Sequence, residues 1–340
     1  MSENTKYRGI LKSTSLFGFV QIFNILIKII LNKVVAVVLG GPSSEAEVSR
    51  RTGTAIAEAL REKGYNAVEV ELVPEKLVEQ LKEIDAKVVF NAVHGMYGED
   101  GRLQSMLEAI KMPYTGSGVL ASAVAMDKIA TKRFLISANI STPKSLMYNK
   151  RFDKDAELIE KEIIATFGVP VVIKAADQGS SIGVEIVKSE ADVKTALENV
   201  FKYSDLVLVE ECINGKELTC GVMEVEGELK ALPIVMIVPH SGSYDFESKY
   251  TKGATDYLVP APLSEEVTAY VQGLAVETYK VLGLSGVARI DVMLDAENVG
   301  YVLEANTIPG MTATSLVPKE AAAIDIDFAS LCEMILLSAK

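Results

Sequence analysis

The sequence predicts a protein of mixed α/β and α+β class, in which an open, mostly parallel sheet precedes two α+β units. Three observations support this expectation. Residues 33–39 form a continuous apolar run that ends in Gly40 and Gly41, which is typical of a buried parallel strand. Strand and helix patterns then alternate up to about residue 130. Beyond that point the strand patterns follow one another as hairpins with helices on one side, which indicates α+β layers.

The first unit covers residues 33–130 of a 340-residue chain, which is long enough for two or three domains. Its strands and helices are expected in alternation at residues 33–39, 45–63, 68–72, 75–83 and 88–93. In such a sheet ligands bind beyond the carboxyl ends of the strands, which here carry the runs GGPSSEAEVS and HGMYGEDG. No Gly-x-Gly-x-x-Gly run is present, so a dinucleotide fingerprint is absent.

Two further units follow along the chain. Residues 131–215 are expected to hold strands at 145–148, 169–174, 183–187 and 206–210, with helices at 153–167 and 191–203. Residues 216–340 hold long strands, the polar loop HSGSYDFESKYTKGATDY, a helix at 264–282, an acidic hairpin and terminal helices. Long polar loops commonly close over reactive intermediates, so Tyr250 is a candidate lid residue, although a lone loop tyrosine more often packs.

Residues 1–32 form an N-terminal extension of unclear role. Its apolar stretch, residues 16–31, contains Gln21, Asn24 and Lys28 and is shorter than the roughly 20 apolar residues that a membrane-spanning helix needs. Basic residues precede it, as in a signal peptide, but no small-x-small cleavage site follows. We expect a peripheral helix or a frayed extension and no stable membrane insertion. A wrongly assigned start and a membrane anchor are the alternatives.

Composition limits the partners and the compartment. With 34 basic and 46 acidic residues the formal net charge is -12, and no basic stripe is visible, which argues against nucleic acid as a partner. The three cysteines, Cys212, Cys220 and Cys332, have neither metal-site nor disulfide spacing, so a reducing cytoplasm is the simplest compartment. Only His94 and His240 are present, which excludes a histidine-rich metal site.

The most informative segment is the run VARIDVMLDAENVGYVLEAN at residues 287–306, which is predicted to fold as a hairpin. If the turn closes with Asp295 opposite Gly300, then Asp291 pairs with Glu304. Directly opposed side chains lie about 5 Å apart, so two like charges there repel each other. The chain tolerates such a pair if a cation lies between the carboxylates.

The same register pairs Arg289 with Asn306. Oxygen ligands from Asp291, Glu304 and Asn306, with no cysteine or histidine nearby, indicate a hard cation, magnesium before zinc. Magnesium held by a few carboxylates usually keeps its other positions for water and substrate phosphates, so the hairpin suggests nucleotide chemistry. The alternative is a solvated hairpin with ordinary surface acids.

Candidates for nucleotide binding lie mainly in the second unit. The loop KAADQGSSIG joins two strands, so it is not a Walker loop, but its glycines and serines let backbone amides and hydroxyls approach a phosphate. Lys174 ends the preceding strand and can place an ammonium group on phosphates, whereas the role of Lys128, on a probable helix, depends on context. Glu210 and Glu211 end the strand LVLVEE, Glu217 follows after a turn at Gly215, and such carboxylates can accept from ribose hydroxyls. A flexible loop and solvated charges are the alternatives.

Candidates for substrate binding lie in the first and third units. His94 follows a buried strand at the sheet edge where ligands bind, although a satisfied loop histidine is the alternative. Glu45 opens a helix, where it either complements the helix dipole or faces a substrate ammonium group. Gly310 and Ser315 follow the acidic hairpin, where glycine permits close backbone approach and the serine either binds a carboxylate or caps a helix.

Taken in order, these motifs make the chain resemble the D-alanine–D-alanine ligase family of ATP-grasp enzymes. The matching runs are GGPSSEAEVS, HGMYGEDGRLQ, PYTGSGVLASAVAMDK, VVIKAADQGSSIG, LVEECINGKELT, SYDFESKY, ARIDVMLD and LEANTIPGMTATSLVP, and they extend from about residue 33 to the end. Their joint order makes the resemblance specific. Two departures from the family pattern are Ala175, where a proline is usual, and Glu211, where a lysine is frequent.

The resemblance implies an ATP-grasp fold of three domains, with ATP gripped between the second and third. The residues implied to bind ATP are Lys128, Lys174, Ser180, Ser181, Glu210, Glu211, Ile213 and Glu217. The ligands implied for magnesium or manganese, with two ions expected, are Asp291, Glu304 and Asn306. The residues implied beside the first D-alanine are Glu45, Ser180 and Tyr250, with His94 near them. The residues implied for the second D-alanine and the oxyanion are Arg289, Gly310, Ser315 and Leu316. The catalytic residues among these would be Glu45, Ser180, Tyr250 and Arg289.

The implied reaction is ATP-dependent ligation of two D-alanine molecules through an acyl phosphate, for peptidoglycan precursor synthesis. The implied protein is a cytoplasmic homodimer that acts on small molecules. Within the class, a D-alanine–D-serine or depsipeptide ligase is the alternative, although Tyr250 in its SKY sequence resembles D-alanine-selective members. A non-catalytic ATP-binding module and a membrane-associated scaffold built on residues 1–32 are alternatives from other classes.

Overall fold

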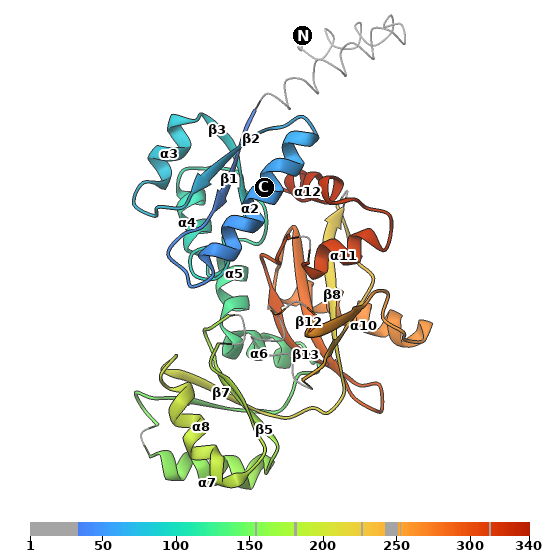
Figure 1. Ribbon diagram of the computed structural model, residues 1–340. Helices are drawn as coiled ribbons and strands as arrows, with labels where there is room; N and C mark the ends of the chain where they lie inside the picture. The colour runs from blue at the N-terminus through green and yellow to red at the C-terminus, as the bar shows by residue number, and fades with distance from the viewer. Residues whose placement is uncertain are drawn as a thin grey trace, which may run out of the picture.

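The computed structural model describes residues 33–340 except residues 154, 180–181, 226, 242–250, 252 and 313. Three sheets follow one another along the molecule in Figure 1, from the blue N-terminal sheet at the top to the green and yellow sheet at the bottom. This arrangement confirms the expected mixed fold class with an open parallel N-terminal sheet. The predictions for residues 1–32, Ser180, Ser181 and Tyr250 lie outside the described residues.

The N-terminal sheet is parallel and has the order β2-β1-β3. Its elements are β1 (Val34–Leu39), α2 (Ala46–Glu62), β2 (Asn66–Glu71), α3 (Leu77–Glu83), β3 (Ala86–Asn91) and α4 (Arg102–Ala109). Both faces of β1 are covered, as its continuous apolar run predicted. Val35 and Val37 pack in a core shared with α2 and α12 (Phe328–Leu337), whereas Ala36 and Val38 pack with α3 and α4.

The second sheet is antiparallel and has the order β4-β7-β5-β6. Its elements are β4 (Ser145–Asn149), α7 (Ala156–Phe167), β5 (Val171–Ala175), β6 (Val184–Val187), η3 (Glu190–Asp192), α8 (Val193–Val200) and β7 (Leu206–Glu211). Strand alternation gives β5 two faces. Val171, Ile173 and Ala175 are buried in the core formed with α7 and α8, so Lys174 points to the opposite face.

The third sheet has the order β11-β10-β8-β12-β13, and β9 also pairs with β8. Its strands are β8 (Lys216–Val225), β9 (Glu228–Ala231), β10 (Val235–Pro239), β11 (Thr255–Leu258), β12 (Val287–Leu294) and β13 (Gly300–Asn306). The helices that share its main core are α5 (Val119–Met126), α6 (Lys128–Ser137) and α10 (Glu265–Val281). The boundary drawn between residues 130 and 131 therefore falls inside α6.

The hairpin of β12 and β13 has the predicted pairing at its open end and a different turn. Asp291 lies opposite Glu304, as expected. The expectation that Asp295 lies opposite Gly300 is wrong, because Leu294 takes that place. A bulge next to Asp291 absorbs the one-residue difference. Asp295 instead closes the turn, where its Oδ1 accepts from the backbone N–H of Val299 at 2.8 Å.

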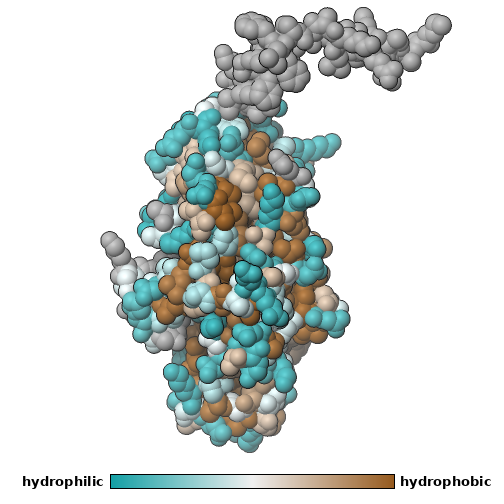
Figure 2. Space-filling model, turned by 90° about the vertical axis from the view of Figure 1, so that its right-hand side faces the viewer, coloured by the Kyte–Doolittle hydropathy of each residue, from teal (hydrophilic) through white to brown (hydrophobic). Residues whose placement is uncertain are grey.

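Surface composition adds one observation. On the face shown in Figure 2, hydrophobic residues are interspersed with hydrophilic ones and do not form a single apolar patch. Within the part of the chain that the structure describes, no helix is both long enough and apolar enough to cross a membrane.

Candidate active site

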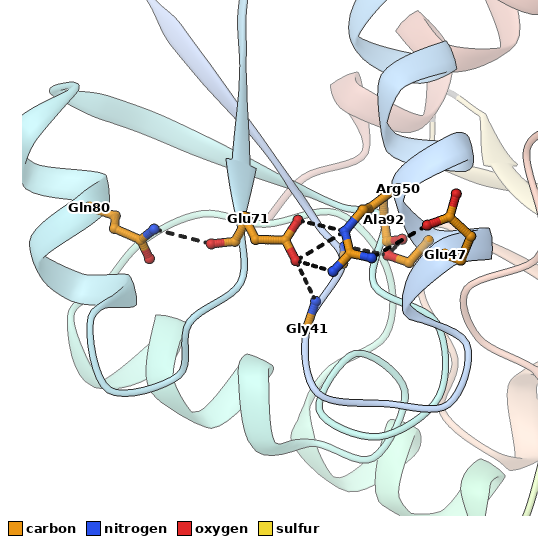
Figure 3. A network of polar contacts seen from close by, with 8 residues as sticks. Gly41, Glu47, Arg50, Glu71, Gln80 and Ala92 are labelled. Carbon is orange, nitrogen blue, oxygen red and sulfur yellow. Dashed lines mark hydrogen bonds and ion pairs between the residues drawn. The ribbon is translucent and has the colours of Figure 1, made fainter.

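The turn that follows β1 is anchored against the neighbouring strands. Arg50 on α2 donates from Nη2 to Oε1 of Glu71 at 2.7 Å, and the same oxygen accepts from the backbone N–H of Gly41 at 3.4 Å (Figure 3). Ser49 donates to the backbone carbonyl of Ala92 at 2.8 Å. These contacts hold the turn after β1 beside the turn after β3, at the carboxyl edge of the sheet.

Glu45 lies in this turn, directly before α2. Its side chain makes no capping hydrogen bond. Instead the carboxylate lies against two glycines: a Cβ added to Gly95 would be 2.7 Å from Oε2, and a Cβ added to Gly179 would be 3.1 Å from the same atom. Glu45 therefore lies where the turn after β3 meets the KAADQGSSIG loop. Its neighbour in this loop, Gly179, directly precedes Ser180 in the sequence.

His94, directly after β3, is buried and uses both ring nitrogens within the protein. Nδ1 lies 3.0 Å from the carbonyl of Ile308, and Nε2 lies 3.0 Å from Oγ1 of Thr52. Because a carbonyl can only accept, the proton lies on Nδ1 and Nε2 accepts from the Thr52 hydroxyl. Burial lowers the pKa of His94 to about 4, so the ring is neutral near pH 7. In this arrangement His94 supports the segment around Ile308.

Glu99 is a site residue that sequence reasoning missed. Its Oε2 accepts from the backbone N–H of Gly95 at 2.8 Å, and its Oε1 accepts from that of Ile308 at 3.2 Å. Desolvation and the nearby charge of Glu45 raise the pKa of Glu99 to about 8, against the opposing effect of these hydrogen bonds and of Arg289. The only signal in the sequence was its place in the glycine-flanked run HGMYGEDG.

Two lysines converge on Glu210, near the end of β7. Glu210 is 1% exposed; its Oε1 accepts from Nζ of Lys132 at 2.5 Å, and its Oε2 forms an ion pair with Nζ of Lys174. Burial alone would raise the pKa of Glu210, but the two ammonium groups outweigh burial and hold this pKa below its usual range. Both carboxylate oxygens contact ammonium groups, so Glu210 orients Lys132 and Lys174 in this structure.

Lys174 and Lys128 flank the KAADQGSSIG loop. Burial opposes the charge on Lys174, but Glu210, Glu304 and Glu217 raise its pKa above the ordinary value, so the ammonium group is charged. Lys128, the first residue of α6, donates from Nζ to the carbonyl of Gln178 at 2.7 Å and lies 3.3 Å from Oε2 of Glu304. Lys128 therefore links the loop to the acidic hairpin.

On the hairpin, each of the two opposed acids meets a protein cation. Asp291 accepts from Nε and Nη2 of Arg289 at 2.9 and 2.8 Å, from Oγ1 of Thr219 at 2.5 Å and from Nδ2 of Asn306 at 3.1 Å. Glu304 lies beside Lys128. The repulsion that the sequence predicted between the two carboxylates is thus relieved by Arg289 and Lys128 in this structure. A metal site is therefore indicated by the oxygen donors of the hairpin and not by this repulsion.

That donor set fits a hard cation. Asp291, Glu304 and Asn306 can supply oxygen ligands and lie on one hairpin, in two cross-strand pairs that are separated by one pair. Among the described residues no cluster of three histidine, cysteine, aspartate or glutamate side chains could hold a metal ion by itself. A hard cation at this hairpin would take its third protein ligand from the amide oxygen of Asn306.

The remaining nucleotide candidates lie around the end of β7. Glu211 accepts from the backbone N–H of Lys144 at 2.8 Å through its Oε1, so this acid braces β4 against β7. Ile213 is partly exposed in the turn between β7 and β8. Glu217 lies at the start of β8 and is one of the acids that act on the charge of Lys174.

The candidates for the second substrate lie after the hairpin. Ser315 occupies the N-cap position of α11 (Leu316–Ala322) without capping it; its Oγ accepts instead from the backbone N–H of Thr312 at 3.0 Å. A Cβ added to Gly310 would lie 2.8 Å from this Oγ, so a side chain at position 310 would displace the Ser315 hydroxyl. The side chain of Leu316 is buried with Val235.

Burial also identifies Glu320 on α11, which sequence reasoning missed. Its Oε2 accepts from the backbone N–H of Gly221 at 2.8 Å, in the stretch of β8 between the segments paired with β9 and β10. A Cβ at Gly221 would lie 2.3 Å from that oxygen, so only glycine admits the acid. Burial raises the pKa of Glu320 to about 8.

Two antiparallel sheets with lysines and acids on facing segments, set beside a parallel sheet, define an ATP-grasp enzyme. The chain matches the family described as D-ala D-ala ligase C-terminus over residues 135–337 and the one described as D-ala D-ala ligase N-terminus over residues 71–117. It belongs to the D-alanine–D-alanine ligase family.

Relatives and solved structures agree with this assignment. The chain is 44% identical over 309 residues to a D-alanine--D-alanine ligase of Syntrophotalea carbinolica, covering 91% of this chain and 96% of the relative. It is 44% identical over 304 residues to one of Carboxydothermus hydrogenoformans, covering 89% and 97%. A crystal structure of D-alanine--D-alanine ligase from Bacillus anthracis complexed with ATP has a TM-score of 0.77 and 34% identity, covering 90% of this chain and 97% of that chain.

Proposed function

We propose that this protein joins two D-alanine molecules at the expense of ATP to give D-alanyl-D-alanine, ADP and phosphate, for peptidoglycan precursor synthesis. One observation carries the proposal: three segments meet at the KAADQGSSIG loop. Lys128 links this loop to Glu304 of the acidic hairpin, and Glu45 approaches the same loop at Gly179. Contributions from all three parts of the fold therefore meet at one place, as a reaction with a nucleotide and two small substrates requires.

In the first step, a carboxylate oxygen of one D-alanine attacks the γ-phosphorus of ATP, and ADP leaves. Phosphoryl transfer depends mainly on positioning and on neutralising charge. The ammonium groups of Lys128 and Lys174 would neutralise negative charge on the phosphates. Asp291, Glu304 and Asn306 would hold magnesium or manganese, two ions in our proposal, which would supply further positive charge to the phosphates.

In the second step, the amine of another D-alanine attacks the acyl phosphate carbon, and phosphate leaves with the C–O bond electrons. Arg289 would stabilise the oxyanion, and the segment with Gly310, Ser315 and the backbone of Leu316 would bind the second substrate. Glu45 would face the ammonium group of the first D-alanine, with Ser180 and Tyr250. His94 and Glu99 would support this site through Ile308 and Gly95.

D-Serine as the second substrate is the alternative within this chemistry. The D-Ala:D-Ser ligase VanG from Enterococcus faecalis also shares the fold, with 30% identity and a TM-score of 0.76. The 44% identity to D-alanine--D-alanine ligases favours D-alanine. We further infer a homodimer in the cytoplasm, where ATP is available and where the free thiols of Cys212, Cys220 and Cys332 would stay reduced.

The test is incubation of the full chain with ATP, magnesium and D-alanine, with ADP and dipeptide measured together by mass spectrometry. We expect one ADP per dipeptide, and no ADP above background with L-alanine. Equimolar D-serine or D-lactate added to D-alanine measures the choice of second substrate. ADP formation that does not depend on D-alanine would overturn the proposal, and a predominant mixed product would move it to the alternative ligase.

A further inference from the structure

Lys132 is a fully buried lysine, four residues after Lys128 on α6. Its ammonium group donates to Oε1 of Glu210 at 2.5 Å and to Oγ1 of Thr142 at 2.8 Å. A fully buried lysine is rare and costs free energy unless it is paired. Neither the reaction nor the family resemblance assigns Lys132 a role, so its burial needs an explanation.

The contacts of Lys132 connect the second sheet to the third. On one side, Glu210 also forms an ion pair with Lys174 on β5. On the other side, Thr142 donates to the carbonyl of Val302 on β13 at 2.8 Å, two residues before Glu304. The backbone N–H of Val302 in turn donates to Ser141 at 2.9 Å. A continuous chain of polar contacts thus runs from the acidic hairpin, through the segment between α6 and β4, to the lysine aimed at the phosphates.

The charges of Lys132, Glu210 and Lys174 indicate how Lys132 affects Lys174. Glu210 is one carboxylate shared by two ammonium groups, so the buried trio carries a net charge of plus one. If Lys132 were absent, Lys174 would be the only cation paired with Glu210 in this trio. The pair would then carry no net charge. With Lys132 holding one oxygen, Lys174 stays displaced toward the other, and positive charge remains for an anion.

We infer that Lys132 is a positioning residue for ATP: by occupying one oxygen of Glu210 and the hydroxyl of Thr142, it sets the position of the Lys174 ammonium group and ties the second sheet to the acidic hairpin. This inference rests on the proposed function for the identity of the nucleotide. It makes the loss of Lys132 a defect in binding the triphosphate and leaves the D-alanine sites as they are.

The test is the Lys132→Met variant, which keeps the length and removes the charge. We expect its Kd for a non-hydrolysable ATP analogue with magnesium, measured by calorimetry, to rise at least tenfold. In turnover, KM for ATP should rise similarly while KM for D-alanine stays within about twofold, a split that a general loss of structure would not produce. Arg133→Met is the matched control, because Arg133 is the exposed neighbour on the same helix and should keep parental values.

Two further variants apply if Lys132→Met does not fold. Thr142→Val keeps the shape and removes the second partner of Lys132, and it should raise the same Kd several-fold. Lys132→Met combined with Glu210→Gln leaves no unpaired buried carboxylate; its Kd should be no higher than that of Glu210→Gln alone, because both changes act through one contact. Parental affinity for the analogue in a folded Lys132→Met or Thr142→Val protein would overturn the inference. Absence of D-alanine-dependent ADP formation in the parent would instead count against the proposed function, since analogue binding is measured without turnover.

Discussion

Asp291 and Glu304 face each other across the β12–β13 hairpin, yet each carboxylate has its own cation, Arg289 at 2.8 Å and Lys128 at 3.3 Å. Arg289 and Lys128 thus offset the two negative charges of the hairpin without a bound ligand. In the proposed function, a metal ion at these acids would compete with Arg289 and Lys128 for the two carboxylates.

The first prediction concerns the metal ligands. Asp291→Ala removes one hairpin carboxylate, and we expect turnover to fall by about 10²–10³-fold, the scale of losing one contact to developing charge. Chelation of divalent ions should abolish ADP formation in the parent, and magnesium or manganese should restore it. Glu297→Gln is the control, because this acid is exposed in the turn of the same hairpin. Parent-like turnover of Asp291→Ala would contradict the assignment.

The second prediction separates the charge of Arg289 from its shape. Arg289 holds Asp291 with two nitrogens, Nε and Nη2, and lysine cannot reproduce this fork. We expect Arg289→Lys to lower kcat by about 10²-fold, with little change in KM for ATP. Steady-state kinetics at saturating ATP would measure this. A lysine variant with more than a tenth of parental kcat would show that charge alone is sufficient.

The third prediction concerns the turn after the hairpin. Gly310→Ala places a methyl group 2.8 Å from the Ser315 hydroxyl oxygen, so the serine must move. We expect KM for the more weakly bound D-alanine to rise about tenfold, since overpacking costs roughly 1–3 kcal/mol. Gly273→Ala, on α10 where a Cβ meets nothing within 4 Å, is the control and should leave both D-alanine KM values unchanged. Equal effects of the two substitutions would argue against a substrate role for this turn.

The fourth prediction is a pH dependence of stability from Glu99. Its pKa is about 8 in the folded protein and about 4.5 ordinarily, so between these pH values the unfolded chain releases a proton that the folded chain keeps. The contribution of Glu99 to the free energy of unfolding is therefore present below about pH 4.5 and is lost as the pH rises toward 8.

The measurement compares the parent with Glu99→Gln in urea titrations followed by circular dichroism, because the chain has no tryptophan. From pH 5 to pH 8 we expect the parent to lose on the order of 1–3 kcal/mol relative to the variant, a value reduced for the partial exposure of Glu99. The contributions of His94 and Glu320 are common to both proteins and cancel. A pH-independent difference would show that Glu99 is ionised throughout this range.

Local patterns in the sequence predicted several features correctly. The apolar run of β1 predicted a strand covered on both faces. The predicted hairpin paired Asp291 with Glu304, as the structure does. The turn was wrong because closure depends on the hydrogen bonds of Asp295, which strand periodicity does not report. The roles given to Ser180, Tyr250 and the other site residues stay predictions.

By itself the sequence determined the order of the elements, the family and the residues with suitable chemistry, because side-chain periodicity and motif order are properties of neighbouring residues. Only the tertiary structure decided which charges are buried and with whom they pair. Lys132 and Lys128 lie on the same helix and look alike in the sequence. Lys132 is buried because Glu210, 78 residues away along the chain, is brought against it. Whether a charged group is solvated or paired depends on such distant segments, since the free energy of burying it is set by what surrounds it in space.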